Sequence, residues 1–209
     1  MSHWEVYVPA PFRNQDAEVL IAFMREHGFA TLISAPGGRP WATHLPLLVE
    51  RSGDALLLRS HLARANPQWT HFPEADVLAI FGGPHALIDP SWYFSRPNVP
   101  TWDYIAVHAY GPARLVEGPA TREIAYGLVQ RYTPAMPPIP KDFEEGMLRA
   151  VVTFEIEVSS LIASYKLSQN KPAADQDSVA QHLAQSPLEH ERAIARAISL
   201  LRERGEADR

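Results

Sequence analysis

Residues 29–60, FATLISAPGGRPWATHLPLLVERSGDALLLRS, hold the pattern that decides the fold. Apolar runs alternate with two turn sequences, Pro36-Gly37-Gly38 and Ser52-Gly53-Asp54. Glycine and proline at these places favour tight turns, which indicates strands on either side of them. The predicted strands cover residues 29–35, 39–50 and 55–60. Three strands joined by tight turns form an antiparallel meander.

Further strands and helices are predicted on both sides of this meander. Alternation of apolar and polar residues indicates strands at 76–81, 86–88, 105–116 and 151–161. Helical periodicity and capping signals indicate helices at 16–27, 66–72, 121–132, 143–150 and 186–204. In the last of these, Ser186-Pro187-Leu188-Glu189 reads as a capping box. The expected fold class is mainly β with peripheral helices (α+β), built as a small closed antiparallel β-barrel.

Residues 84–111 combine proline with an unusual density of aromatic rings. Between Pro90 and Tyr104, five rings accompany Pro90, Pro97 and Pro100, which oppose both helix and strand, so a loop is expected. Rings in a loop must be buried against something, and three candidates are another subunit, the barrel or a flat ligand. The five rings are Trp92, Tyr93, Phe94, Trp102 and Tyr104.

Composition excludes several classes of protein. The chain has 209 residues, a formal net charge of −5 and no cysteine, so disulfides, thiolate metal sites and cysteine nucleophiles are excluded. No metal-binding, nucleotide-binding or serine-hydrolase motif is present, and no metal site is expected. No apolar run of membrane-spanning length and no signal peptide occur, which predicts a cytoplasmic protein without a membrane partner. Charges in 187–209 balance, which favours an amphipathic helix over a DNA-reading one.

Residues 59–67, RSHLARANP, join a strand end to a helix start. Guanidinium groups, a hydroxyl and a helix N-terminus in one place suit a phosphate monoester. The alternative is that Asn66 only caps the helix while Arg59 and Arg64 are solvated. Residues 166–172, KLSQNKP, are equally ambiguous, since they suit a surface turn or a loop over a cofactor's ring edge or phosphate. In the strand 39–50, Thr43 and His44 point to opposite faces, so only one can face the interior.

Taken together, these motifs resemble the PaiB-type, FMN-binding negative transcriptional regulators. The resemblance covers roughly residues 7–172. One departure is Asp103, which stands where the family pattern has asparagine. The matching stretches are YVP (7–9), HGFATL (27–32), PWATHLPL (40–47), HLARANPQW (61–69), AIFGGPHA (79–86), PSWY (90–93), VPTWDY (99–104), VHAYG (107–111) and KLSQN (166–170).

The resemblance implies a split β-barrel like that of pyridoxamine-phosphate oxidases and small flavin reductases. It also implies a homodimer with FMN at the subunit interface. Residues 1–172 would form the FMN-binding domain and residues 173–209 a C-terminal helical extension packing on the barrel. Carried onto this chain, the cofactor-binding residues are Thr43, Arg59, Ser60, His61, Arg64, Asn66, Trp102, Lys166, Ser168, Gln169 and Asn170.

The aromatic segment then divides between two roles. Because interface cores favour aromatic residues, Trp92 and Tyr93 are expected chiefly to build the dimer. Trp102 and Tyr104 are expected to close the flavin pocket. Trp92 is the alternative to Trp102 as the ring that flanks the flavin.

The expected function is an FMN-binding regulator or flavin-dependent sensor. Its expected partner is DNA or a protein that responds to the state of the flavin. One alternative is a flavin-dependent oxidoreductase, in which the flavin performs the redox step. Another is binding of haem or a different planar ligand. The sequence assigns no catalytic residue and leaves open whether the protein is an enzyme.

Overall fold

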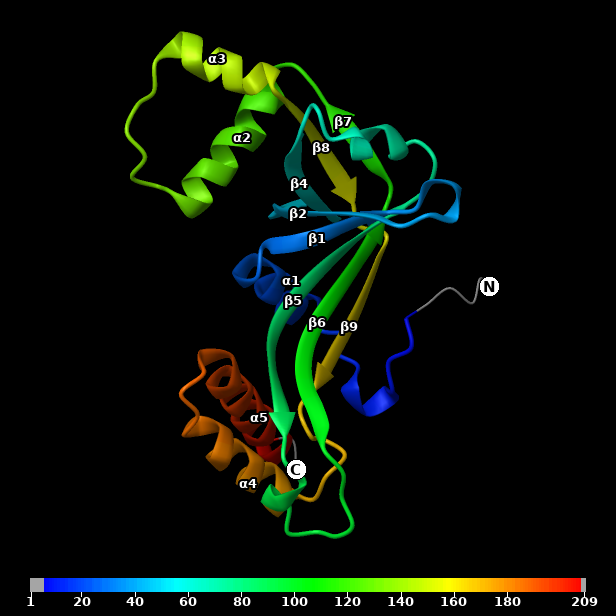
Figure 1. The fold of residues 1–209 in the computed structure, drawn as a ribbon, viewed down its shortest axis with the longest axis vertical. Coiled ribbons are helices and arrows are strands. Elements are labelled where there is room, and N and C mark those ends of the chain that lie inside the picture. Colours follow the sequence, from blue (N-terminus) through cyan, green and yellow to red (C-terminus); the bar gives the residue numbers. More distant parts are fainter. Residues whose placement is uncertain (1–5, 208–209) are drawn as a thin grey trace. The chain divides into compact units, whose positions relative to one another are not determined.

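The computed structural model describes residues 6–207, and these form two compact units. Unit 1 holds residues 6–16, 82–107 and 162–207 of the described chain, and unit 2 holds residues 17–81 and 108–161. The chain passes between the units within three strands, β5 (Val77–Ile88), β6 (Thr101–Gly111) and β9 (Ser160–Lys166). Figure 1 shows the helices and strands of the chain.

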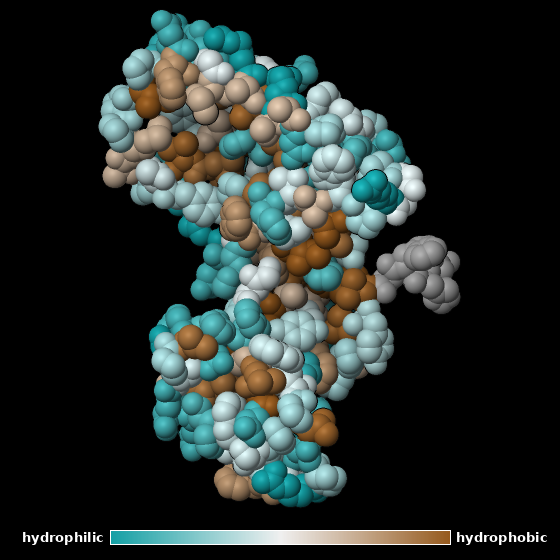
Figure 2. Space-filling view, in the orientation of Figure 1, coloured by the Kyte–Doolittle hydropathy of each residue, from teal (hydrophilic) through white to brown (hydrophobic). Residues whose placement is uncertain are grey.

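Unit 2 carries most of the strands. Its elements are α1 (Ala17–Glu26), β1 (Phe29–Ser34), β2 (Trp41–Pro46), β3 (Leu48–Ser52), β4 (Ala55–Ala63), the 3-10 helices η2 (Pro36–Gly38) and η3 (Pro67–His71), β7 (Ala113–Val116), α2 (Pro119–Tyr132), α3 (Lys141–Arg149) and β8 (Val151–Glu157). The largest fully buried side chains of this unit come from its strands and from α1, and they include Met24, Leu32, Leu58, Phe154 and Ile156. Apolar surface is also visible over α2 and α3, where Phe143 and Met147 are exposed (Figure 2).

The strands form two sheets. One has four strands in the order β3-β4-β8-β7, and the other has five in the order β2-β1-β5-β6-β9. The pairs β1–β2, β1–β5, β3–β4, β4–β8 and β7–β8 are all antiparallel. The prediction of an antiparallel α+β protein is therefore confirmed. The prediction of a closed barrel is wrong, because the described strands divide into two sheets that do not close.

The predicted strand 39–50 is broken at Leu47 into β2 and β3. Strand β2 pairs with β1, while β3 pairs with β4 in the other sheet. Pro46 has no N–H for a sheet ladder, and the N–H of the buried Leu47 instead donates to the Gly28 carbonyl oxygen at 2.8 Å. The three-strand meander is thus two hairpins that belong to different sheets.

Three other strand boundaries differ from the prediction. Residues 76–81 and 86–88 belong to one strand, β5. The stretch 105–116 is divided at Pro112 into β6 and β7, since proline cannot donate within a ladder. The stretch 151–161 is divided into β8 and β9, because the N–H groups of Val158 and Ser159 turn to the carbonyls of Leu56 and Tyr110.

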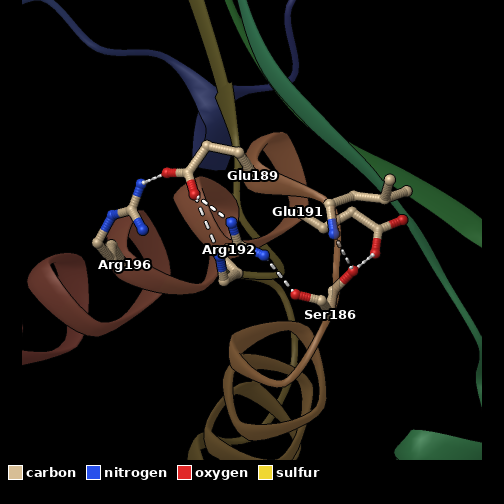
Figure 3. Close-up of polar contacts among 6 residues, drawn as sticks. Ser186, Glu189, Glu191, Arg192 and Arg196 are labelled. Atoms are coloured by element: carbon tan, nitrogen blue, oxygen red, sulfur yellow. Dashed lines mark hydrogen bonds and ion pairs between the residues drawn. The ribbon is translucent and has the colours of Figure 1, made fainter.

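Unit 1 contains four helices besides its parts of β5, β6 and β9. They are η1 (Ala10–Phe12), η4 (Pro90–Trp92), α4 (Ala173–Ala184) and α5 (Glu189–Ala207). Helix α4 was not predicted from the sequence; it packs along α5 and buries Val179 and Leu183, while α5 buries Ile194 and Ile198. At the start of α5, Ser186 Oγ accepts the Leu188 N–H at 3.1 Å and donates to Glu191 rather than Glu189 (Figure 3). Glu189 instead binds Arg192 and Arg196.

The aromatic loop is shorter than predicted, since Trp102 and Tyr104 lie on β6. Tyr93 is only 2% exposed within its own chain, and the Lys171 ammonium lies 4.7 Å from the centre of its ring. Trp92 stacks on His182 of α4 with ring centres 5.1 Å apart. The expectation that Trp92 and Tyr93 chiefly build a dimer is therefore wrong for Tyr93, because its ring is already buried against its own chain.

Candidate functional site

Thr43 and Asn66 meet where strand β4 gives way to η3. Asn66 Oδ1 accepts the Gln68 N–H at 3.1 Å and so caps η3, which begins at Pro67 as the sequence predicts. The Asn66 side-chain amide also donates to Thr43 Oγ1 at 2.9 Å. The Thr43 hydroxyl acts as acceptor in this bond, so its own proton is available to another acceptor.

Arg59 and Ser60 follow each other on β4 and point to opposite faces. Arg59 Nε lies 3.0 Å from Glu155 Oε2, and Arg59 Nη1 lies 2.9 Å from Glu50 Oε2. Ser60 is fully buried, and its hydroxyl donates to the Pro46 carbonyl oxygen at 2.5 Å. Both side chains therefore have partners inside the protein, and the structure does not gather them with Arg64.

His61 contributes a buried polar atom rather than an ion pair. Its Nδ1 atom is buried and has no hydrogen-bond partner among the residues that the structure describes. Burial lowers the pKa of the His61 imidazole below its ordinary value. A ligand could supply the hydrogen bond that this ring nitrogen of the neutral imidazole lacks.

Arg64 lines a cavity of about 580 Å³ in unit 2. Its Nε and Nη2 atoms donate to the carbonyl oxygens of Arg149 and Val151, each at 2.8 Å. These bonds fix the guanidinium but do not neutralise it, since both acceptors are uncharged. Trp69, Thr121, Arg122 and Arg149 line the same cavity.

Arg122 and Arg149 are residues that the sequence reasoning missed. They stand on α2 and α3, and Arg149 is 85 positions from Arg64 in the chain. No motif connects them, so only the fold brings them to one cavity. Arg122 pairs with Glu144, whereas Arg149 Nη1 is 3.9 Å from Glu145 with both side chains well exposed. Glu117 also lines the cavity, so the positive charge that suits a phosphate group, with no carboxylate partner in the described chain, is chiefly that of Arg64.

The other predicted cluster lies in unit 1, around residues 166–170. Lys166, Ser168 and Asn170 line a cavity of about 330 Å³, together with Asp103. Gln169 takes no part, because its amide oxygen accepts the Leu167 N–H at 2.6 Å and its amide nitrogen donates to the Tyr165 carbonyl oxygen. Trp102 is 53% exposed on β6, and its carbonyl oxygen accepts from the Lys166 ammonium.

Asp103 is the buried acid of this second cavity. The Ser168 hydroxyl donates to Asp103 Oδ2 at 2.6 Å, and the Lys166 ammonium lies 3.9 Å from Oδ1. Burial raises the pKa of Asp103 above its ordinary value, and the Ser168 hydrogen bonds and the Lys166 charge oppose that rise.

The two clusters fit FMN in their chemistry. Arg64, Thr43 and Asn66 in unit 2 offer a charge and polar side chains of the kind that bind phosphate. The second cavity, in unit 1, offers ammonium and amide donors beside a buried carboxyl, as the polar edge of a flavin ring requires. Among residues 6–207, no group of three or more histidine, aspartate or glutamate side chains is placed to hold a metal ion.

A family model described as "Putative FMN-binding domain" matches residues 6–160. The chain belongs to this FMN-binding family. The match confirms the resemblance drawn from the motifs. A relative from Bacillus subtilis (strain 168), "Protease synthase and sporulation protein PAI 2", is 38% identical over 185 residues, which cover 85% of this chain and 89% of the relative.

Solved structures show the fold of this member of the FMN-binding family. The "FAD and Heme binding protein" from Mycobacterium smegmatis has a TM-score of 0.57 at 15% identity, covering 74% of this chain and 73% of that one. The "Flavocytochrome Anf3" from Azotobacter vinelandii has a TM-score of 0.56 at 18% identity, covering 74% and 69%. The fold is the antiparallel split-barrel type with peripheral helices. No helix in the described part of the chain is both long and apolar enough to cross a membrane.

Proposed function

We propose that this protein binds FMN and acts as a flavin-dependent sensor in negative control of transcription. The observation that carries the proposal is the match of residues 6–160 to the FMN-binding family. The regulatory role follows from the resemblance to the PaiB-type regulators, which the relative named "Protease synthase and sporulation protein PAI 2" supports. When bound, the flavin would supply the redox chemistry, and the protein would set its access and orientation.

The residues proposed to bind FMN form one cluster in each unit. In unit 2, Arg64, Asn66 and Thr43 would hold the phosphate, whereas Arg59 and Ser60 are bound to partners of their own. Lys166, Ser168 and Asn170 would hold the ring, and Trp102 would flank it. We further propose a cytoplasmic homodimer with FMN at the subunit interface, as the family resemblance implies.

Titration with two flavins tests this proposal. The wild-type protein should quench FMN fluorescence with a saturable dissociation constant, and riboflavin, which lacks the phosphate, should bind more weakly. Arg64→Gln should raise the dissociation constant of FMN about tenfold or more while leaving that of riboflavin unchanged. Arg204→Gln, an exposed arginine of α5, is the matched control and should change neither. Absence of FMN binding by the wild-type protein would show that the proposal is wrong.

The regulatory part needs its own measurement. The formal net charge of −5 does not by itself draw the chain to DNA. A gel shift with a promoter fragment at two salt concentrations should show a complex whose affinity falls steeply with salt. A complex that forms only in the presence of a second protein would place the DNA contact on that partner.

A flavin-dependent oxidoreductase is the second candidate, favoured by the flavocytochrome neighbour of similar fold. Sustained oxidation of NAD(P)H with added FMN would support it over a pure sensor. An absorption spectrum of the purified protein separates a flavin from haem, which is the third candidate.

A further inference from the structure

The cavity of about 330 Å³ in unit 1 has an unusual wall for a surface pocket. Asp103 lines it and is fully buried, and its Oδ1 atom has no hydrogen-bond partner among the residues that the structure describes. A buried carboxyl oxygen without a donor is costly, and native proteins rarely leave one. The cavity beside it is where a ligand could supply the missing donor.

The loop that carries the other wall is held in an uncommon shape. Ser168 has a φ of 58°, a left-handed conformation that serine seldom adopts. It is kept there by its hydrogen bond to Asp103 Oδ2 and by its carbonyl oxygen, which accepts the Lys171 N–H at 2.9 Å. Backbone strain of this kind persists where the surrounding structure fixes it, and it gathers at ligand sites.

Two lysine side chains bring hydrogen-bond donors to this cavity. The Lys166 ammonium is anchored by Thr101 Oγ1 and the Trp102 carbonyl oxygen, and it has a third proton left. The Lys171 ammonium is anchored by Asn98 Oδ1. Both lysines line the cavity, as does the exposed Asn170. The lining therefore combines one buried acceptor with several donors.

This arrangement selects among ligand chemistries. A carboxylate or a phosphate carries no N–H for Asp103 Oδ1 and would meet a carboxyl at close range. An imide edge, with its C=O, N–H and C=O groups in a row, offers a donor between two acceptors. Such an edge can use both the acceptor and the donors of this lining, and the ring of a flavin carries one.

We propose that this cavity receives the imide edge of the flavin ring, with Asp103 accepting the ring N3–H and the two lysines donating toward the flanking carbonyl oxygens. The inference rests on the proposed function, because it assigns one end of the same cofactor. It adds Asp103 and Lys171 to the cofactor-binding residues that the family resemblance supplies. It also assigns the 166–170 loop to binding of the ring edge rather than of the phosphate.

A ligand series on the wild-type protein tests the inference without any variant. Riboflavin and 3-methylriboflavin are compared by fluorescence titration, since the methyl group removes the N3–H and neither ligand has a phosphate. We expect methylation to weaken binding about tenfold or more, because it leaves the buried Asp103 Oδ1 acceptor without its hydrogen-bond donor. Riboflavin lacking the 7- and 8-methyl groups, which are at the opposite edge of the ring, should bind with little change.

A variant then ties the effect to one residue. Asp103→Ala should bind riboflavin as weakly as the wild-type protein binds 3-methylriboflavin, and methylation should cost it nothing more. Asp177→Ala, an exposed carboxylate of α4, is the matched control and should retain the full methylation effect. Circular dichroism and a melting curve check that each variant is folded. If Asp103→Ala does not fold, the ligand series on the wild-type protein tests the inference by itself.

The outcomes separate the inference from the proposed function. A wild-type protein that binds FMN and riboflavin but does not distinguish 3-methylriboflavin would overturn the inference and leave the proposed function standing. A wild-type protein that binds neither flavin would contradict the proposed function itself. A methylation effect that persists unchanged in folded Asp103→Ala would assign the N3–H to another acceptor and overturn the inference as well.

Discussion

The Ser168 hydroxyl donates to Asp103 Oδ2 at 2.6 Å, and both residues are almost completely buried. This bond joins β6 to the loop after β9 and holds a carboxyl group away from water. Burial raises the pKa of this carboxyl group above its ordinary value.

Asp103→Asn is expected to stabilise the protein at neutral pH. Because the folded-state pKa of Asp103 is raised by burial, this group favours folding most at low pH, and that contribution is lost as pH rises through the raised pKa. The amide carries no charge and still accepts from Ser168. Urea unfolding should show the variant more stable than the wild type near pH 8, with the difference shrinking toward about pH 4. Asp177→Asn, on the surface, should show no such convergence; a constant difference for Asp103→Asn would contradict the assignment.

Arg59→Ala is expected to destabilise unit 2. Glu155 is only 4% exposed, and loss of Arg59 removes one of its two arginine partners, the other being the exposed Arg114. A buried carboxylate that loses a hydrogen-bonded charge partner should lower the free energy of unfolding by about 2 kcal/mol. The measurement is chemical unfolding at neutral pH.

The control for Arg59→Ala is Arg51→Ala. Arg51 pairs with Glu18, and both side chains are largely exposed, so its loss should cost less than about 1 kcal/mol. Equal losses for the two variants would mean that the burial of Glu155 does not matter.

The sequence predicted the antiparallel α+β class because alternation and turn residues are local signals. It could not predict that Leu47 divides one apolar run between two sheets, since residues 39–50 alternate like a single strand. The hydrogen bond from the Leu47 N–H to the Gly28 carbonyl oxygen joins positions that are far apart in the sequence. Helix α4 was missed because its buried face includes polar residues, among them Asp175, whose carboxylate accepts the N–H groups of Phe94 and Ser95.

The candidate site was predictable in part for the same reason. Asparagine directly before proline is a recognisable helix-cap signal at Asn66, and the 166–170 motif is contiguous. Both could therefore be found from the sequence. Arg59 and Ser60 belong to the same motif, yet Arg59 binds Glu155 on the paired strand β8, and Ser60 binds the Pro46 carbonyl oxygen of β2, a strand of the other sheet. Arg122 and Arg149 carry no motif at all, and only the packing of α2 and α3 on the four-stranded sheet places them beside Arg64.

Gly111→Ala is expected to be strongly destabilising. A Cβ at this position of β6 would lie 2.0 Å from the Glu157 carbonyl oxygen, which is backbone and cannot swing aside. The two segments must move apart, which should cost about 3 kcal/mol or more and lower the melting temperature by several degrees. Gly82→Ala is the matched control on β5, where a Cβ meets nothing within 4 Å. A Gly111→Ala protein with the melting temperature of the wild type would contradict the close approach of these two segments.

Ser186→Ala is expected to weaken the start of α5. The Ser186 hydroxyl accepts the Leu188 N–H at 3.1 Å and donates to Glu191, so alanine removes both bonds at once (Figure 3). Loss of a helix cap of this kind costs about 1 kcal/mol, and amide hydrogen exchange should quicken in the first turn of α5 before it changes elsewhere. Ser199→Ala is the control within the same helix, because Ser199 only donates back to the Ala195 carbonyl oxygen and alanine is the better helix former. Faster exchange in Ser199→Ala than in Ser186→Ala would contradict the capping role, whereas the Arg192 bond to the Ser186 carbonyl oxygen should survive in both variants.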